Sequence, residues 1–144
     1  IRKNHHGSRV LVVDDEATIR VLLQMQLEDA GLAVDTAIDG QSAITRASLA
    51  SYDAILMDVQ LPGLDGLEAT RQIRKIPGYG IVPIIATTAD SSSEAKARCM
   101  AAGMDDFLAK PYVAEALFFT LLRWLGQRHT NDSQACTDNR SEQS

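Results

Sequence analysis

The amino-acid sequence predicts an α/β protein built on a doubly wound parallel sheet of five βα units. Short apolar runs rich in β-branched residues alternate along the chain with segments of helical periodicity, which is typical of repeated βα units. Several runs are apolar at every position, as strands are when helices cover both faces of a sheet. Glycines and capping residues stand at the junctions between the two kinds of segment.

Five short segments are the expected strands, because each is apolar and is bounded by polar or turn-forming residues. They are residues 10–13, 33–37, 54–57, 84–87 and 107–109.

The first expected helix follows the first of these strands. Ile19, Leu22, Leu23 and Leu27 recur at the spacing of a core-facing helical stripe. Gly31 lies just past this stripe, where a left-handed C-terminal residue favours glycine. We therefore expect a helix that ends before Gly31 and directs all four aliphatic side chains into the core.

Capping residues mark the starts of the next three helices. Asp39 is the expected cap of the second helix, and Asp65 with Glu68 forms a cap-like pair before the third. The run 91–94 has the Ser-x-x-Glu spacing of a capping box before the fourth helix, which we expect to end at Gly103.

The last helix is expected from about residue 112 to residue 125, with Gly126 beyond it. Its core stripe is Val113, Leu117, Leu121 and Trp124, and a second apolar stripe is Phe118, Leu122 and Leu125. The second stripe fits either a wide core face or an exposed partner surface, which would suit a weak dimer through this helix.

One domain is expected, because 144 residues leave little room for a second core. It should span residues 9–126. We interpret residues 1–8 as a linker or a remnant of cloning. Residues 127–144 are interpreted as a flexible polar tail, since they include no aliphatic side chain larger than alanine.

The composition argues against several classes of protein. A formal net charge of -5 gives nucleic acid no electrostatic reason to bind. No run approaches the roughly 18 apolar residues of a membrane span, and no signal segment is visible. Two cysteines have neither the spacing of metal ligands nor the density of a disulfide scaffold. We expect a cytoplasmic domain without direct membrane or nucleic-acid contact.

Acidic residues follow two of the expected strands. Asp14 and Asp15 follow the first strand, and Asp58 follows the third. In a doubly wound sheet of strand order 2-1-3-4-5 these strands are neighbours, and ligands bind outside their carboxyl ends. Crowded carboxylates raise one another's pKa values unless a cation neutralises them, and hard oxygen ligands suit Mg²⁺. The sequence therefore predicts a Mg²⁺ site, with Mn²⁺ as a substitute.

The same edge of the sheet should also carry a cation and a hydroxyl group. Lys110 follows the fifth strand, and Thr87 and Thr88 end the fourth. A phosphoryl group in transfer is stabilised by a metal, an ammonium and hydrogen-bond donors. Because a carboxylate can serve as the nucleophile that forms an aspartyl phosphate, this edge suits phosphoryl transfer.

Four fragments, taken together and in this order, resemble the receiver domains of response regulators in two-component signalling. They are DD at 14–15, MDVQLPGLDG at 57–66, ATTA at 86–89 and KP at 110–111. Each stands at the end of an expected strand, and the resemblance covers about residues 9–126. It implies a flavodoxin-like (βα)5 fold of strand order 2-1-3-4-5 and a role in a phosphorelay.

The resemblance implies a role for each matching residue. Asp58 is the expected phosphoacceptor, and Asp15 a direct metal ligand. Asp14 is a metal-side carboxylate that often acts through water, and the backbone carbonyl of Gln60 is a further ligand. Lys110 is expected to pair with the phosphoryl oxygens.

Three further expectations follow from the resemblance. Thr88, which precedes a small residue, is the expected hydroxyl switch residue, whereas Thr87 should point elsewhere. Phe107 matches the aromatic switch position, with an ordinary core residue as the alternative. The peptide bond before Pro111 is one that is cis in the family.

The resemblance also implies partners. The phosphodonor is the dimerisation and phosphohistidine domain of a histidine kinase, or a histidine phosphotransfer protein, and a receiver promotes its own phosphorylation and dephosphorylation. The chain does not start with methionine, residues 127–144 are too few for a DNA-binding domain, and LEATR at 67–71 resembles receivers of hybrid sensor kinases. The C-terminal receiver of a hybrid kinase is therefore our first expectation, and a free-standing regulator the second.

Two other classes of protein remain as alternatives. The run DDEAT at 14–18 weakly resembles the nucleophile motif of haloacid-dehalogenase-type phosphatases, in which Asp14 would be the nucleophile. Glu16 stands where that motif has aspartate. A flavodoxin-like flavin binder would cradle a phosphate in its first loop, but here that loop is acidic and would repel it.

Overall fold

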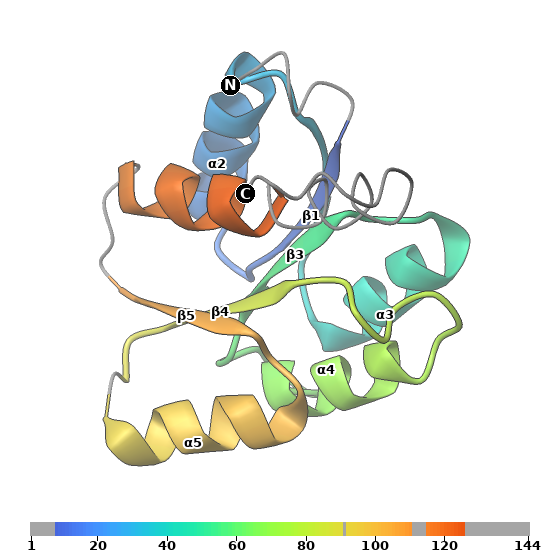
Figure 1. Cartoon of the computed structure of the whole chain (residues 1–144), viewed down its shortest axis with the longest axis vertical. Helices are drawn as coiled ribbons and strands as arrows, with labels where there is room; N and C mark the ends of the chain where they lie inside the picture. Colours follow the sequence, from blue (N-terminus) through green and yellow to red (C-terminus); the bar gives the residue numbers. More distant parts are fainter. Residues whose placement is uncertain (1–7, 91, 111–114, 126–144) are drawn as a thin grey trace, which may run out of the picture.

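The computed structural model describes residues 8–90, 92–110 and 115–125. Strands and helices alternate along it (Figure 1). The elements are β1 (Arg9–Val13), α2 (Ala17–Asp29), β2 (Ala33–Ala37), α3 (Gly40–Leu49), β3 (Ala54–Asp58), α4 (Gly66–Arg74), β4 (Ile84–Thr88), α5 (Ser93–Ala102) and β5 (Asp106–Ala109), followed by a helical segment, 115–125. All five expected strands are present, each within one residue of its expected ends.

The five strands form one parallel sheet in the order β2-β1-β3-β4-β5. This order confirms the predicted fold class. Val13 is the register partner of Met57, and Asp58 is the partner of Thr87. The carboxyl ends of β1, β3 and β4 therefore reach the same edge of the sheet.

Helices cover both faces of the sheet (Figure 1). Side chains alternate between the faces along a strand, so Leu11 enters one core cluster and Val12 the other. The first cluster includes buried residues of α3, α4 and α5, and the second includes buried residues of α2 and of segment 115–125. Full coverage explains the unbroken apolar runs 10–13, 54–57 and 84–86 within the three central strands.

Most of the expected helix ends are confirmed. The Asp39 carboxylate accepts a hydrogen bond from the Ser42 N–H at 2.8 Å and begins α3, and the Asp65 carboxylate begins α4 in the same way. Gly31 and Gly103 have φ angles of 98° and 107°, the left-handed conformation that favours glycine after a helix.

Two expectations about the helices were wrong. Leu22 is 49% exposed, because α2 meets the sheet through a narrow face that Leu23 and Leu27 already fill. The predicted capping box puts the cap of the fourth helix at residue 91, but Ser92 is the cap residue of α5, one position later. The Ser92 hydroxyl accepts from the Ala95 N–H at 3.1 Å, and Glu94 lies in the first turn, where the helix dipole favours a negative charge.

The helical segment 115–125 presents a wide core face. Leu117 and Leu121 are fully buried as expected, but Leu125 of the second stripe is also buried, and Phe118 packs against the same cluster. The alternative of a wide core face therefore explains these two residues, while Phe119 is 69% exposed. The expected start of this helix, Val113 and Gly126 lie outside the described residues.

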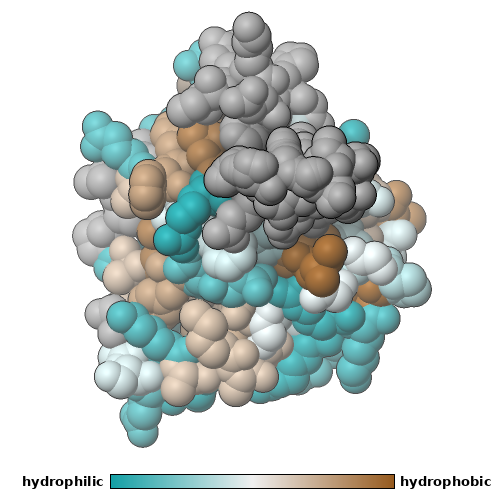
Figure 2. Space-filling model, in the orientation of Figure 1, coloured by the Kyte–Doolittle hydropathy of each residue, from teal (hydrophilic) through white to brown (hydrophobic). Residues whose placement is uncertain are grey.

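The described surface carries both polar and hydrophobic side chains. In the view of Figure 2, hydrophobic residues form separate patches among hydrophilic ones. Among the described residues, none of the helices combines the length and apolar character that a membrane span requires.

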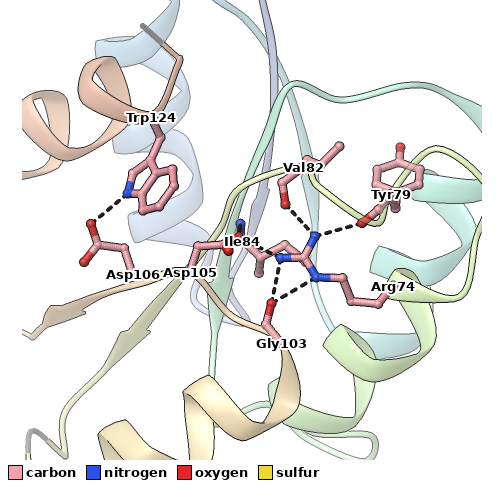
Figure 3. Close-up of polar contacts among 8 residues, drawn as sticks. All are labelled: Arg74, Tyr79, Val82, Ile84, Gly103, Asp105, Asp106 and Trp124. Carbon is pink, nitrogen blue, oxygen red and sulfur yellow. Dashed lines mark hydrogen bonds and ion pairs between the residues drawn. The ribbon is translucent and has the colours of Figure 1, made fainter. Parts of the chain in front are cut away.

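Arg74, the last residue of α4, joins three segments at the edge of the sheet opposite the strand carboxyl ends (Figure 3). Its guanidinium donates to the carbonyls of Gly103 at 2.6 and 2.9 Å, Tyr79 at 2.8 Å and Val82 at 2.6 Å. It also pairs with the Asp105 carboxylate at 2.7 Å. A planar, forked donor can satisfy several acceptors at once, so Arg74 ties the end of α5 to the approach to β4.

Replacing Arg74 should therefore destabilise the fold. We expect Arg74→Met to lower the free energy of unfolding by about 2–4 kcal/mol, because three carbonyls lose their guanidinium donor and Asp105 loses its ion pair. The matched control is Arg71→Met, in the same helix, which removes only an exposed ion pair with Glu68 and should cost less than about 1 kcal/mol. Urea unfolding measures both, and equal losses would contradict this role for Arg74.

Candidate functional site

Three carboxylates meet where the first and third strands end. Asp14 follows β1, and Asp58 is the last residue of β3. One oxygen atom of each of Asp14, Asp15 and Asp58 lies within 4.8 Å of the others. The structure thus confirms the predicted convergence, which results from the parallel pairing of two buried strands.

Asp14 is held firmly although it is buried to 2% exposure. One carboxylate oxygen accepts from the Glu16 N–H at 2.9 Å, and the other accepts from Lys110 Nζ at 3.3 Å. Its own N–H donates to the Ala37 carbonyl at 3.1 Å. Asp15, in contrast, is exposed, and no described residue donates a hydrogen bond to its side chain.

Asp58 is equally buried, at 2% exposure. One carboxylate oxygen accepts from the Gln60 N–H at 3.1 Å and the other from Lys110 Nζ at 3.1 Å. Burial raises the pKa of Asp58, and the negative charge of Asp14 adds to the rise. Lys110 and the Gln60 N–H oppose this effect without cancelling it, so the pKa lies above its ordinary value.

Lys110 follows β5, two strands along the sheet from β3, and its side chain reaches both buried carboxylates. Its backbone N–H donates to the Thr88 carbonyl at 2.7 Å, which fixes the chain at the end of β5 beside β4. Burial disfavours its charged form, but attraction by Asp58 and Asp14 is stronger, so the pKa of Lys110 lies above its usual value. The ammonium therefore stays charged at neutral pH.

The two threonines occupy different positions at the end of β4. Thr88 is buried, and its hydroxyl oxygen accepts from the Asp90 N–H at 3.1 Å, which leaves the hydroxyl hydrogen available to another acceptor. The Thr87 carbonyl accepts from the Val59 N–H at 3.0 Å, in the loop after Asp58.

Gln60 and Phe107, two further expected site residues, differ in exposure. Gln60 is exposed, beside Asp58. Phe107 is partly buried and packs against the first core cluster, with Lys96 Nζ 5.3 Å from its ring centre. This cation–π contact was not expected, because it depends on the spacing between α5 and β5. Pro111 lies outside the described residues, so its cis bond stays a prediction.

Gly66 is a site residue whose role the sequence did not reveal. In the sequence it is the last residue of the fragment 57–66, where an Asp-Gly pair indicates only a turn. In the structure a Cβ atom at Gly66 would overlap the Asp58 carbonyl oxygen and lie 2.8 Å from Val59 Cα. The Gly66 N–H also donates to the Val59 carbonyl at 3.0 Å. Only glycine lets the start of α4 pack this closely beneath the loop that carries Asp58.

The donor set fits a divalent cation. Three carboxylates face one ammonium, which leaves two negative charges in excess. A single Mg²⁺ or Mn²⁺ ion would balance them. All donors are hard oxygen atoms, and the exposed position of Asp15 leaves room for the water ligands that Mg²⁺ retains.

Comparisons with known proteins agree with this geometry. A family model described as the response regulator receiver domain matches residues 10–121. The transcriptional regulatory protein ResD of Bacillus subtilis is 44% identical over 105 residues, which are 73% of this chain and 42% of ResD. The sensor protein GacS of Pseudomonas syringae is 38% identical over 121 residues, 82% of this chain and 13% of GacS. The chain thus spans less than half the length of these curated relatives.

Solved structures give the same result. The receiver domain of sensor histidine kinase PA1611 from Pseudomonas aeruginosa, which holds a magnesium ion in its active-site cleft, is 41% identical with a TM-score of 0.78. The match covers 83% of this chain and 98% of that one. Chemotaxis protein CheY4 of Vibrio cholerae is 38% identical, with a TM-score of 0.79 over 81% of this chain and 98% of CheY4. The chain belongs to the response regulator receiver domain family.

Proposed function

We propose that this receiver domain takes a phosphoryl group from a phosphohistidine onto Asp58 in a Mg²⁺-dependent reaction. One observation carries the proposal: a buried carboxylate at a strand end contacts a lysine ammonium and lies within 4.8 Å of two further carboxylates. The family serves in two-component signal transduction, and its receivers interact with histidine kinases or phosphotransfer proteins.

The contacts of Asp58 suit a nucleophile. An oxygen of Asp58 attacks the phosphorus atom while the P–N bond breaks and its electron pair returns to the imidazole ring. The Gln60 N–H and the Lys110 ammonium hold the two carboxylate oxygens in place. Lys110 then neutralises charge on the transferred oxygens, and the Thr88 hydroxyl donates a hydrogen bond to one of them.

Asp14, Asp15, Asp58 and the Gln60 carbonyl are the proposed ligands of the cation. By the resemblance to the family, Asp15 would bind the cation directly and Asp14 would act through water. Bound Mg²⁺ would neutralise negative charge on the phosphoryl oxygens during the transfer. The magnesium ion reported for the PA1611 receiver supports this assignment.

We further propose that Thr88 and Phe107 respond to phosphorylation and that the bond before Pro111 is cis. The free hydroxyl hydrogen of Thr88 supports the first part. The partly buried ring of Phe107 leaves room for a change of rotamer, which the Lys96 ammonium would oppose by about 0.5–1 kcal/mol.

In our first proposal this chain is the C-terminal receiver of a hybrid sensor kinase, and in the second it is a free-standing regulator. Relatives that are sensor kinases, GacS and BarA, support the first. The domain would span residues 9–126 and face the cytoplasm. Its phosphodonor would be a kinase phosphohistidine domain or a phosphotransfer protein. The family match leaves no support for a haloacid-dehalogenase-type phosphatase that uses Asp14, or for a flavin binder.

Phosphorylation of the chain should require Asp58. After incubation with Mg²⁺ and acetyl phosphate, intact-mass measurement should show one phosphoryl adduct per chain. EDTA should abolish the adduct, because charge on the transferred oxygens is then unbalanced. Asp58→Asn should abolish it as well, whereas Asp29→Asn, an exposed change of the same kind on α2, should leave it intact. An adduct that persists in Asp58→Asn would refute the assignment.

Ionised Asp58 should lower the free energy of unfolding. Its pKa is raised in the folded protein, so its ionised form destabilises the fold at neutral pH. This cost is present above the raised pKa and disappears as the pH falls below the ordinary aspartate value of 3.8. In EDTA at pH 7, Asp58→Asn should therefore raise the free energy of unfolding by about 1 kcal/mol.

Urea unfolding of the wild type and Asp58→Asn between pH 7 and pH 4 measures this effect. The advantage of the variant should shrink toward pH 4, and Asp29→Asn should show no such trend. A variant less stable than the wild type at pH 7 would mean that the contact with Lys110 outweighs burial.

A further inference from the structure

Arg20 is a cation beside the carboxylate cluster that the proposed phosphoryl chemistry does not use. It lies in the first turns of α2 and is half-buried. Its guanidinium donates to the backbone carbonyl of Asp14 at 2.8 Å. Among the described residues, no carboxylate lies within ion-pair distance of its side chain. Its position is therefore set by a main-chain oxygen rather than by an opposite charge.

That oxygen belongs to the peptide unit between Asp14 and Asp15. A peptide unit is planar, so its carbonyl oxygen and the two flanking Cα atoms lie in one plane. A donor that holds this oxygen limits rotation of the plane, and so restricts ψ of Asp14 and φ of Asp15, the two angles that set where their side chains leave the backbone. Hydrogen bonds from charged donors contribute about 1.5–3 kcal/mol, enough to favour one orientation strongly.

The other contacts of Asp14 leave this oxygen as the last free group. Its N–H is held by Ala37, and its two carboxylate oxygens by Glu16 and Lys110. With Arg20, all four hydrogen-bonding groups of Asp14 have partners. Asp15 has only the shared peptide plane to orient it, because its side chain is exposed and receives no hydrogen bond from a described residue.

The charge of Arg20 acts in the opposite direction. Lys110 already contacts two of the carboxylates, and a second positive charge beside the site weakens cation binding through repulsion. The two effects therefore predict opposite results when Arg20 is removed. Loss of repulsion alone would tighten metal binding, and loss of the peptide anchor would weaken it.

We propose that Arg20 is a positioning residue for the metal ligands, which it orients by holding the peptide plane between Asp14 and Asp15. The inference rests on the proposed metal-dependent function. Arg20 acts through the two aspartates and touches neither the metal nor the phosphoryl group. Its anchoring effect exceeds its repulsion, because the hydrogen bond is short and half-buried whereas the repulsion is screened by solvent and salt.

The test is Mn²⁺ affinity, measured from the free-ion signal in electron paramagnetic resonance, with Mg²⁺ as competitor. Trp124 fluorescence is unsuitable, because the indole is bonded to Asp106, at the other end of β5 from Lys110. We expect Arg20→Met to bind Mn²⁺ about tenfold more weakly, a loss of about 1.4 kcal/mol. Arg20→Lys, which can return one donor to the carbonyl, should recover part of the affinity.

The matched control is Arg46→Met, which removes an equal charge from an exposed site on α3. It should leave the affinity unchanged. Measurements at 0.1 M and 1 M salt separate the two effects, because the Debye length falls from about 10 Å to about 3 Å. The weakening by Arg20→Met should persist or increase at high salt, because salt screens only the opposing repulsion. Thermal unfolding in EDTA shows whether each variant is folded at the temperature of the titration.

Two results would overturn the inference. Equal or tighter Mn²⁺ binding by folded Arg20→Met would show that Arg20 acts through its charge alone or only on stability. A weakening that vanishes at 1 M salt would exclude a positioning role. Failure of the proposed function looks different, because then the wild type itself would bind no Mn²⁺.

Discussion

Electrostatic repulsion among the carboxylates of Asp14, Asp15 and Asp58 is the constraint on which the site depends. Two like charges about 4 Å apart repel by about 4 kcal/mol at an effective dielectric constant of 20, and three pairs act here. Lys110 relieves part of this energy by contacting two of the three carboxylates. The remaining negative charge is the feature that suits the divalent cation proposed for this site.

Packing of the fold offsets the repulsion among these carboxylates. β3 is buried along its whole length, and β1 from Val10 to Val13, so their backbones have little freedom to move the aspartates apart. Close packing of Gly66 beneath Asp58 fixes the loop after β3 in the same way. At the opposite edge, Arg74 fixes the segments around the start of β4. Rigid packing at both edges therefore holds like charges at distances that free side chains would avoid.

Apolar runs and strand-end residues were sufficient to predict the sheet and most of the site. A strand buried on both faces has a distinctive composition, and its carboxyl end then locates Asp14, Asp58 and Lys110. Contacts that use main-chain carbonyls had no such signal. Arg20 and Arg74 both act on backbone oxygens, and nothing in the sequence distinguishes them from arginines on the surface. Helical periodicity also failed at Leu22, because it predicts which residues share a face but not how wide the covered face is.

The site is asymmetric in a way that follows from burial. Asp14 and Asp58 are buried and carry hydrogen bonds on both carboxylate oxygens, whereas Asp15 and Gln60 are exposed. The buried half is already ordered, so binding a ligand there costs little conformational entropy. Among the described residues of the site, the exposed half is the side open to the proposed ion and phosphodonor. Order on one side and access on the other are both required, since phosphoryl transfer needs a fixed nucleophile and a donor that arrives from outside.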